Sequence, residues 1–327
     1  MKTLRITSAV LLACSLAVGV GLSSAAAAAV SPLASVWTEP DAGYGFLYAA
    51  VASARHRIDL SMYELKDPTM VSDLGAAAKR GVAVTVILNS AYFGTSKNAA
   101  AASALSGEHV HVVWAPSGQI FHAKYMVVDN ARAYIGSGNL VNYDYPSTRD
   151  FWVLDTNPND LHALTTTFTN DVRGTGTTAY AGGLVWSPGS TTALINLIAS
   201  AHHTLLVENE EMYSYDIEDA LVAARHRGVA VTVVMTRDSK YYSDLSTLAA
   251  AGVSVRLLSS SQLYIHAKVM CVDCVGSRGT ALVSSINFST SSLSYNRELG
   301  VITTSPAVVA AVRSAVSADA AMGRAYH

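Results

Sequence analysis

The sequence repeats itself at about half its length, and this duplication restricts the fold more than any other feature. Four short segments recur 144 to 150 residues further along the chain. The recurrences are Val36-Trp37 with Val185-Trp186, Met62-Tyr63 with Met212-Tyr213, Gly81–Val86 with Gly228–Val233, and His122-Ala-Lys124 with His266-Ala-Lys268. A unit repeated once at this spacing is long enough to form a domain-sized half. The chain is therefore predicted to fold as two similar tandem halves.

Each half alternates predicted helices with predicted strands. In both halves a helix ends in basic residues followed by a glycine, Gly81 or Gly228, and a β-branched strand comes next. The expected helices are residues 43–56, 76–80, 191–202 and 220–227, and the expected strands are 57–63, 82–88, 109–114, 204–209, 229–235 and 253–258. This alternation predicts an α/β fold with mostly parallel or mixed sheets flanked by helices. The alanine-rich segment 98–105 is expected to be a helix, with a mobile flap as the alternative.

The first 29 residues have the layout of a signal peptide. Lys2 and Arg5 precede an apolar run, residues 6–22, which is followed by serines and an alanine run. An uncleaved membrane anchor is the alternative, but the run is short for a spanning helix. A lipoprotein signal at Cys14 is also considered, although the apolar run continues past this cysteine. We therefore expect a cleaved leader, residues 1–29, and a secreted protein.

The remaining chain divides into a first half, residues 30–177, and a second half, residues 178–327. The glycine-containing segment 173–183 is the expected linker between them. Without the leader the chain keeps 20 Lys and Arg residues against 24 Asp and Glu residues, a net charge of −4. Proteins that bind nucleic acid without sequence preference usually present a basic surface. The charge therefore favours a substrate other than nucleic acid.

The motif His-x-Lys-x4-Asp occurs once in each half. Its residues are His122, Lys124 and Asp129 in the first half, and His266, Lys268 and Asp273 in the second. On a strand, residues two apart lie on one face, so each histidine is expected to project beside its lysine. Two such faces would form a pocket suited to a phosphate diester. The lysines would neutralise phosphate oxygens, one histidine would attack phosphorus, and the other would protonate the leaving oxygen.

Polar residues follow each motif at matching positions. Ser137 and Asn139 in the first half, and Ser285 and Asn287 in the second, are expected to donate hydrogen bonds to substrate. The small residues around them are expected to let the backbone approach the anion. Further along, Asp150 and Glu298 are candidates to hydrogen-bond the far nitrogen of a histidine and fix its tautomer.

These paired motifs and the residues that follow them resemble the phospholipase D superfamily over about residues 36–300. The resemblance implies two α/β halves around a pseudo-two-fold axis, with the active site at the seam, a phosphohistidine intermediate and no catalytic metal or other cofactor. It implies His122 as the nucleophile and His266 as the general acid and base. It also implies that orienting pairs cross the seam, Glu298 to His122 and Asp150 to His266. Asp129 and Asp273 are expected to hold the fold.

Several residues have two interpretations from sequence alone. Cys271 and Cys274 are expected to form a local disulfide, with a redox pair or free thiols as alternatives. Tyr63 and Tyr213 either line the cleft or serve packing. A small acidic cluster consists of Glu208, Glu210 and Glu211. These residues either line the pocket mouth or form a solvated loop, and we expect the solvated loop.

Three enzymatic functions fit these observations. The first is a phospholipase D that releases phosphatidate and a head group, with transphosphatidylation when an alcohol replaces water. The second is a secreted metal-independent endonuclease, and the third is a cardiolipin-type hydrolase or phosphatidyl transferase. A duplicated binding module without catalysis is the non-enzymatic alternative. We expect phospholipid at a membrane surface as the partner, with nucleic acid as the second choice, no obligate protein partner, and a monomer.

Overall fold

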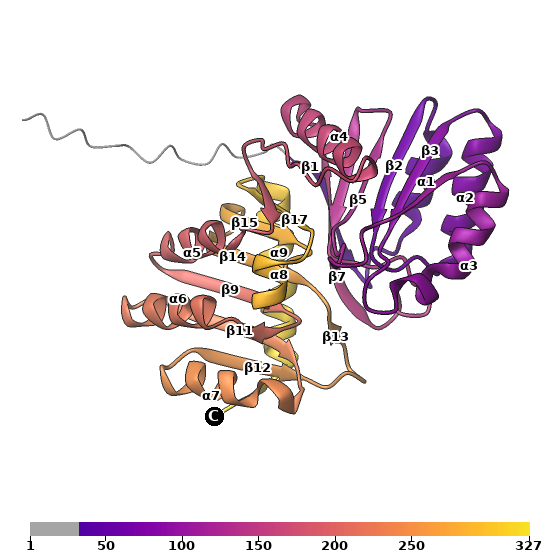
Figure 1. Ribbon diagram of the computed structural model, residues 1–327. Helices are drawn as coiled ribbons and strands as arrows, with labels where there is room; N and C mark the ends of the chain where they lie inside the picture. The colour runs from indigo at the N-terminus through magenta and orange to yellow at the C-terminus, as the bar shows by residue number, and fades with distance from the viewer. Residues whose placement is uncertain (1–32) are drawn as a thin grey trace, which may run out of the picture.

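The structure, a computed structural model, describes residues 33–327 and shows two α/β halves side by side (Figure 1). The expected signal peptide, residues 1–29, lies outside the described residues. The first half contains β1 (Leu33–Glu39), α1 (Gly45–Ser53), β2 (Arg57–Met62), α2 (Pro68–Lys79), β3 (Ala83–Leu88), α3 (Gly94–Gly107), β4 (His111–Trp114), β5 (Lys124–Val128), β6 (Arg132–Gly136), β7 (Thr148–Asp155) and α4 (Pro158–Val172).

The second half begins after the linker and repeats this order with a few additions. It contains β8 (Leu184–Ser187), α5 (Thr191–Ala199), β9 (Thr204–Asn209), β10 (Met212–Tyr213), α6 (Tyr215–His226), β11 (Ala230–Thr236), a 3-10 turn (Ser239–Tyr241), α7 (Tyr242–Ala250), β12 (Ser254–Leu258), β13 (Tyr264–Ile265), β14 (Lys268–Val275), β15 (Arg278–Ser284), β16 (Phe288–Ser289), α8 (Thr290–Ser294), β17 (Glu298–Thr303), α9 (Pro306–Met322) and β18 (Arg324–Ala325). The alanine-rich segment 98–105 lies inside α3, as the helical interpretation expects.

The two sheets have the same strand order. The first runs β1-β7-β6-β5-β2-β3-β4, and the second runs β8-β17-β15-β14-β9-β11-β12 with β18 added at its edge. In each sheet the three strands at the β4 or β12 side are parallel, and the remaining pairs are antiparallel. The sheets are therefore mixed, and the predicted fold of two similar α/β halves is confirmed.

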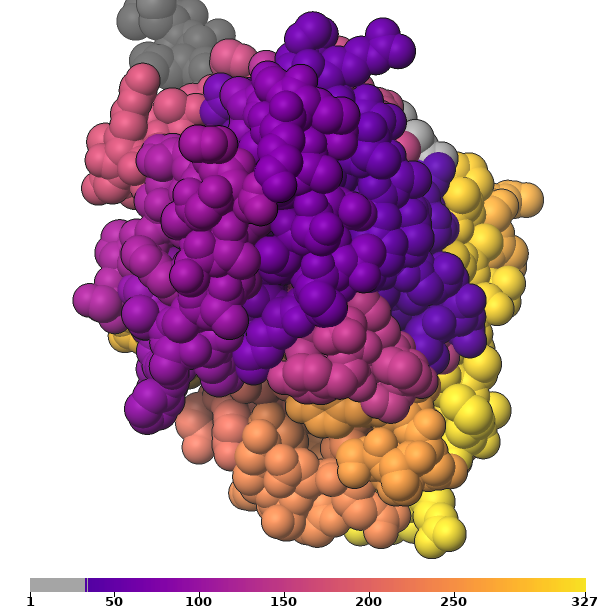
Figure 2. All heavy atoms as spheres, turned by 90° about the vertical axis from the view of Figure 1, so that its right-hand side faces the viewer, coloured from indigo at the N-terminus to yellow at the C-terminus, as the bar shows by residue number. Residues whose placement is uncertain are grey.

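Each sheet packs helices on both faces. Leu47, Met70 and Leu105 belong to an outer core between the first sheet and α1, α2 and α3, and an equivalent core lies beneath α5, α6 and α7. A third core lies between the sheets and includes Phe168 of α4 and Val312 of α9. Because this central core takes residues from both halves, the halves share one buried interface. Figure 2 shows the first half, in indigo to magenta, resting directly on the second.

Backbone hydrogen bonds cross between the halves at two equivalent places. The N–H groups of His122 and Ala123 both donate to the carbonyl of Arg297, at 2.8 Å each. In the other direction, the N–H of His266 donates to the carbonyl of Arg149 at 3.2 Å, and β13 pairs with β7. The segment before the second motif is thus an extra strand on the first half's sheet, and the segment before the first motif makes an isolated bridge, Phe121 with Arg297, to the second half.

The side chains of the same two arginines also cross the seam. Arg149 holds both carboxylate oxygens of Asp319 in α9, at 2.6 and 3.0 Å, and Arg297 holds both of Asp171 in α4, at 3.0 and 2.8 Å. All four side chains are at most 7% exposed. Bidentate pairing in this dry setting fixes the orientation of one half against the other.

The structure corrects one feature of the repeat. Asp129 accepts from the N–H of Arg57 and Asp273 from the N–H of Thr204, so the strands β2 and β9 align at an offset of 147 residues. The same offset relates Gly81 to Gly228. Tyr63 therefore corresponds to position 210, and its recurrence with Met62 as the pair 212–213 does not mark equivalent positions.

Removing one partner of a cross-seam ion pair should destabilise the protein. Asp171→Ala leaves the Arg297 guanidinium buried without its carboxylate, and we expect a loss of about 3–5 kcal/mol in the free energy of unfolding. Urea denaturation measures this loss. The control is Glu108→Gln, which breaks the exposed Lys79–Glu108 pair and should cost less than about 1 kcal/mol. Equal losses for the two variants would contradict the assigned role of the pair.

Candidate active site

The two motifs meet at the seam, but their histidines do not lie on the motif strands. β5 begins at Lys124 and β14 at Lys268, so each histidine sits in the cross-seam segment just before its strand. The histidine and lysine of each motif still project together, as expected: His266 and Lys268 both face Glu210, and His122 and Lys124 both contact the Tyr63 ring. Each ammonium also bonds the backbone of its histidine: Lys124 Nζ donates to the His122 carbonyl at 2.7 Å, and Lys268 Nζ donates to the His266 carbonyl. Both lysines are fully buried.

Each histidine is oriented by a carboxylate from the opposite half. His122 Nδ1 lies 2.9 Å from Glu298 Oε2, and His266 Nδ1 lies 2.8 Å from Asp150 Oδ1. These are the two cross-seam contacts that the resemblance implies. A carboxylate that accepts from Nδ1–H fixes the tautomer and leaves Nε2 as the reactive nitrogen. Both imidazoles thus present the same atom for chemistry.

The serines after the motifs do not face substrate, contrary to expectation. Ser137 Oγ donates to Asp150 Oδ1 at 2.5 Å, and Ser285 Oγ donates to Glu298 Oε2 at 2.6 Å. Both side chains are fully buried. Each hydroxyl also accepts a backbone N–H, from the residue after the carboxylate. The serines therefore hold the carboxylates that in turn hold the histidines.

The glycines beside the first serine pack closely against aromatic side chains. A Cβ on Gly136 would lie 2.4 Å from the Trp152 ring, and one on Gly138 would lie 2.4 Å from the Tyr44 hydroxyl. Any side chain at these positions would push the tryptophan or tyrosine aside. The packing explains why these two positions are glycine, and close approach of an anion to the backbone stays a prediction.

The two asparagines, unlike the serines, line cavities at the site. Asn139 lines a cavity of about 260 Å³ beside His266, and Asn287 lines one of about 350 Å³ beside His122. In each asparagine the Oδ1 atom is buried without a hydrogen-bond partner in the structure. A buried polar atom without a partner is costly unless a ligand or water satisfies it. Substrate contact by these two residues stays a prediction.

Electrostatics make the two half-sites different. Burial lowers the pKa of His122 to about 4, with Glu298 opposing this shift and the Lys124 charge adding to it. Burial also holds the pKa of Lys124 well below its ordinary value. For Glu298, burial raises the pKa, but His122 and Lys124 outweigh it and the net shift is downward. At neutral pH, His122 is therefore an uncharged imidazole whose Nε2 carries a lone pair.

Glu210 is a site residue that the sequence analysis assigned to a solvated loop, with the pocket mouth as the alternative. Its Oε2 lies 2.8 Å from Lys268 Nζ and 3.7 Å from His266 Nε2, and its Oε1 accepts from the Tyr264 hydroxyl at 2.7 Å. Burial alone would raise the pKa of Glu210, but Lys268 and His266 hold it well below its ordinary value. The expected solvated acidic loop is therefore wrong. Glu208, on β9, is also fully buried.

The residue equivalent to Glu210 in the first half is aromatic. Tyr63 places its ring edge-on to His122, with centroids 4.7 Å apart, and the Lys124 Nζ lies 5.0 Å from the ring centroid. One lysine of the site therefore lies over a π-face, and the other is paired with a carboxylate. Aligning the repeats at the Gly81–Gly228 offset would have revealed this substitution.

The motif aspartates hold the fold, as their positions suggest. Asp129 accepts backbone N–H groups of residues 55, 56 and 57, and Asp273 accepts those of residues 202, 203 and 204. Both residues have a left-handed backbone, with φ of 54° and 50°. Slight burial raises the pKa of each carboxyl, but the N–H donors outweigh it and lower the pKa. Each aspartate thus ties a motif strand to its neighbour.

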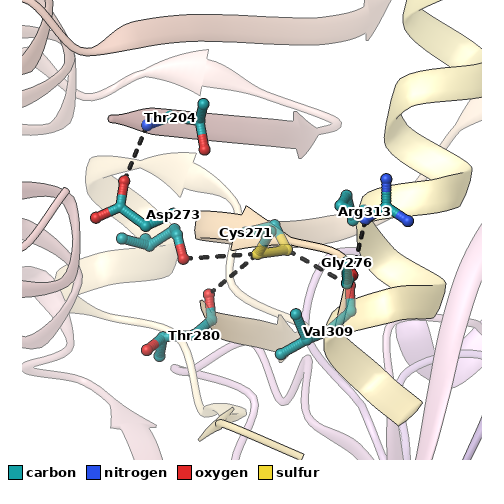
Figure 3. The surroundings of a disulfide bond; sticks show 9 residues. Thr204, Cys271, Asp273, Gly276, Thr280, Val309 and Arg313 are labelled. Atoms are coloured by element: carbon teal, nitrogen blue, oxygen red, sulfur yellow. Dashed lines mark hydrogen bonds between the residues drawn. A yellow bond between two sulfur atoms is a disulfide. The ribbon is translucent and has the colours of Figure 1, made fainter. Parts of the chain in front are cut away.

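A disulfide joins Cys271 and Cys274 at the end of β14. Figure 3 shows it beside Asp273, whose carboxylate reaches the N–H of Thr204 on β9. The covalent loop therefore encloses the aspartate and restrains its turn, in the place expected from the sequence. In residues 33–327 no group of three or more His, Cys, Asp or Glu side chains is arranged to hold a metal ion.

Glu210 should support catalysis without being needed for folding. We expect Glu210→Gln to lower kcat on a soluble phosphodiester roughly 10- to 100-fold, because Lys268 loses its partner and His266 Nε2 loses the facing charge. KM should change little, and the variant should still fold but with a lower melting temperature, because the buried Lys268 ammonium loses its carboxylate. Glu108→Gln, which removes a carboxylate from a surface pair, is the control. A kcat of the variant within about twofold of the wild-type value would show that Glu210 has no role in catalysis.

Family comparison supports a phospholipase D-like assignment for both halves. The family model described as "Cardiolipin synthase, PLD-like domain" matches residues 47–172 and 194–319. Each match contains one complete motif and one of the orienting carboxylates.

Two curated relatives match parts of the chain. "Phospholipase D Z" of Dictyostelium discoideum is 38% identical over 93 residues, which are 27% of this chain and 21% of that protein. "Mitochondrial cardiolipin hydrolase" of Danio rerio is 31% identical over 119 residues, which are 36% of this chain and 50% of that protein. The chain thus spans half or less of the length of these relatives.

A solved structure matches nearly the whole fold. Phosphatidylserine synthase of Haemophilus influenzae Rd KW20 superposes with a TM-score of 0.69 at 11% identity, over 91% of this chain and 89% of that chain. At this identity the likeness concerns the fold alone, in which two α/β halves meet at a seam. Because the family model covers more than half of the sequence, in two copies, the chain belongs to the phospholipase D-like family.

Proposed function

We propose that the protein is a secreted phospholipase D that cleaves phospholipids into phosphatidate and a free head group. The observation that carries this proposal is the pair of cavities at the two histidines. Their lining contains both imidazoles and the asparagines with unpartnered Oδ1 atoms, which suit a phosphate diester. The proposed assignment of roles follows from the charge around each histidine.

In the first half-reaction, His122 Nε2 attacks phosphorus with its lone pair. The bond between phosphorus and the head-group oxygen breaks, and His266 Nε2–H gives its proton to that oxygen. Lys124 and Lys268 each bond the backbone carbonyl of the histidine in the same motif. Their charges stabilise the charge that develops on the phosphate oxygens. The product is a phosphatidyl group bound to His122 and a free head-group alcohol.

In the second half-reaction, water attacks the phosphohistidine while His266 Nε2 takes a proton from it. The bond between nitrogen and phosphorus breaks, and phosphatidate leaves with His122 restored. An alcohol can replace water in this step and gives a new phosphodiester, which is transphosphatidylation. Glu298 and Asp150 keep both rings oriented throughout, because each accepts from Nδ1–H on its histidine.

The charge at the cavity walls favours lipid over nucleic acid. Among the described residues, no lysine or arginine lines either cavity, whereas Asp144 and Asp150 line one and Glu211 lines the other. A nucleic-acid strand carries a phosphate at every nucleotide and requires a positively charged track. A single phospholipid presents one phosphodiester and needs no such track. An endonuclease is therefore the second choice.

Cardiolipin hydrolysis or phosphatidyl transfer is the candidate favoured by the comparisons. The family description names a cardiolipin synthase, and one relative is named a cardiolipin hydrolase. Both reactions use the same phosphohistidine chemistry and differ in the alcohol that enters or leaves.

The signal-peptide layout of residues 1–29 supports export, which suits hydrolysis of phospholipid outside the cell. One chain supplies both motifs, so a monomer completes the site. None of the helices in residues 33–327 is long and apolar enough to cross a membrane.

The test is a parallel assay on lipid and nucleic acid. Purified protein in EDTA is incubated with mixed phospholipid vesicles that include cardiolipin, and separately with plasmid DNA. We expect phosphatidate and free head group, intact DNA, and no turnover by His122→Ala. Degraded DNA beside untouched lipid would make the protein an endonuclease. Activity that appears only after a divalent metal is restored would overturn the proposed mechanism.

A further inference from the structure

Exposed aromatic side chains gather at the mouth of the cavity beside His122. Tyr92 and Tyr213 line this cavity and are 73% and 45% exposed. Phe93, 82% exposed, follows Tyr92 directly, and Tyr295, 67% exposed, precedes the lining residue Asn296. We call Tyr92, Phe93, Tyr213 and Tyr295 the aromatic rim. All four side chains leave large apolar surfaces in water, two of them in the lining of this cavity and two directly next to a lining residue in the chain.

The rim contains a strained backbone segment. Tyr92 and Phe93 are consecutive residues in the left-handed region, with φ of 49° and 61°. This conformation is unfavourable for bulky residues and persists only where surrounding contacts enforce it. The following Gly94 packs so tightly that a Cβ would lie 2.5 Å from the Asn89 carbonyl oxygen. The turn is therefore held in a conformation that presents two aromatic side chains to solvent.

The contacts that hold this turn also reach the catalytic segment. Asn89 Nδ2 donates to the Ala91 carbonyl at 2.7 Å, and Asn89 Oδ1 accepts from the N–H of Phe121 at 3.0 Å. Phe121 directly precedes His122. Asn89 is fully buried, so one side chain fixes both the aromatic turn and the chain next to the histidine. The position of the rim relative to His122 is thus built into the fold.

We propose that the aromatic rim inserts into the surface of a phospholipid bilayer and so brings a lipid phosphodiester to His122. This inference rests on the proposed function and names the surface that the enzyme docks on. Tyr and Phe side chains favour the boundary between apolar lipid and water. A contiguous apolar patch on a protein surface commonly marks such a contact. Because the rim residues carry no formal charge, a zwitterionic bilayer suffices as the partner.

Single-stranded nucleic acid is the competing occupant, since bases stack on exposed aromatic rings. Stacking platforms of that kind are accompanied by cations along the strand's path. The cavity that the rim surrounds contains Glu211 and, among the described residues, no lysine or arginine. The charge at this opening therefore favours lipid.

The test measures membrane binding separately from turnover. Phe93 and Tyr295, the two rim residues that do not line the cavity, are both changed to asparagine. At Phe93 asparagine tolerates the left-handed conformation and so preserves the turn. Tyr180→Asn is the control, because Tyr180 is 74% exposed but lies in the linker between the halves. Binding to phosphatidylcholine vesicles is measured by sedimentation in a His122→Ala background, so that the lipid stays intact. Turnover of a short-chain phospholipid dissolved as monomers is measured with His122 present.

We expect Phe93→Asn/Tyr295→Asn to weaken vesicle binding at least about tenfold, because two large apolar side chains no longer leave water. Turnover of monomeric phospholipid should stay close to wild type, and Tyr180→Asn should change neither quantity. Vesicle binding equal to wild type in the double variant would overturn the proposal. So would a variant that keeps vesicle binding but loses affinity for single-stranded DNA. A wild-type protein that binds vesicles through the rim but hydrolyses neither form of phospholipid would support the rim and refute the phospholipase function.

Discussion

The site depends on one exchange across the seam, in which each half completes the other. The carbonyls of Arg149 and Arg297 accept the backbone N–H of the opposite histidine, and their guanidinium groups grip a helix of that same opposite half. One residue further, Asp150 and Glu298 reach the imidazole rings. Two consecutive residues in each half, Arg149-Asp150 and Arg297-Glu298, therefore position the other half's histidine, orient its ring and hold a helix of that half. Neither half can form a working site alone.

Within this symmetric frame, the two half-sites carry different charges. The duplication places Tyr63 and Glu210 at equivalent positions beside the two motifs, so one lysine meets an aromatic ring and the other a carboxylate. His122 is buried with cationic neighbours and is neutral at pH 7, whereas His266 Nε2 faces Glu210. This difference supplies a physical reason for His122 to attack and for His266 to donate the proton.

Sequence patterns predicted the fold and the main contacts of the site but not its buried hydrogen bonds. The repeat and the glycine-ended helices led to two α/β halves, and the resemblance to the phospholipase D superfamily led from each carboxylate to its histidine. Ser137 and Ser285 were misread because nothing local shows that a hydroxyl faces a buried carboxylate rather than a cavity. Glu210 was misread because an acidic run resembles a solvated loop until long-range packing brings Lys268 beside it. The equivalence of Glu210 to Tyr63 was not recognised, because the repeats were aligned by identical residues and not by strand register.

The central claim is that both motifs form one site in which His122 alone takes the covalent intermediate. Trapping that intermediate tests it most directly: protein is mixed with phospholipid, denatured within the first turnovers, and digested for mass spectrometry of the two motif peptides. The account predicts a phosphatidyl adduct on the peptide that contains His122, and none on the peptide that contains His266. An adduct on His266, or on both histidines equally, would contradict the asymmetry on which the assignment rests.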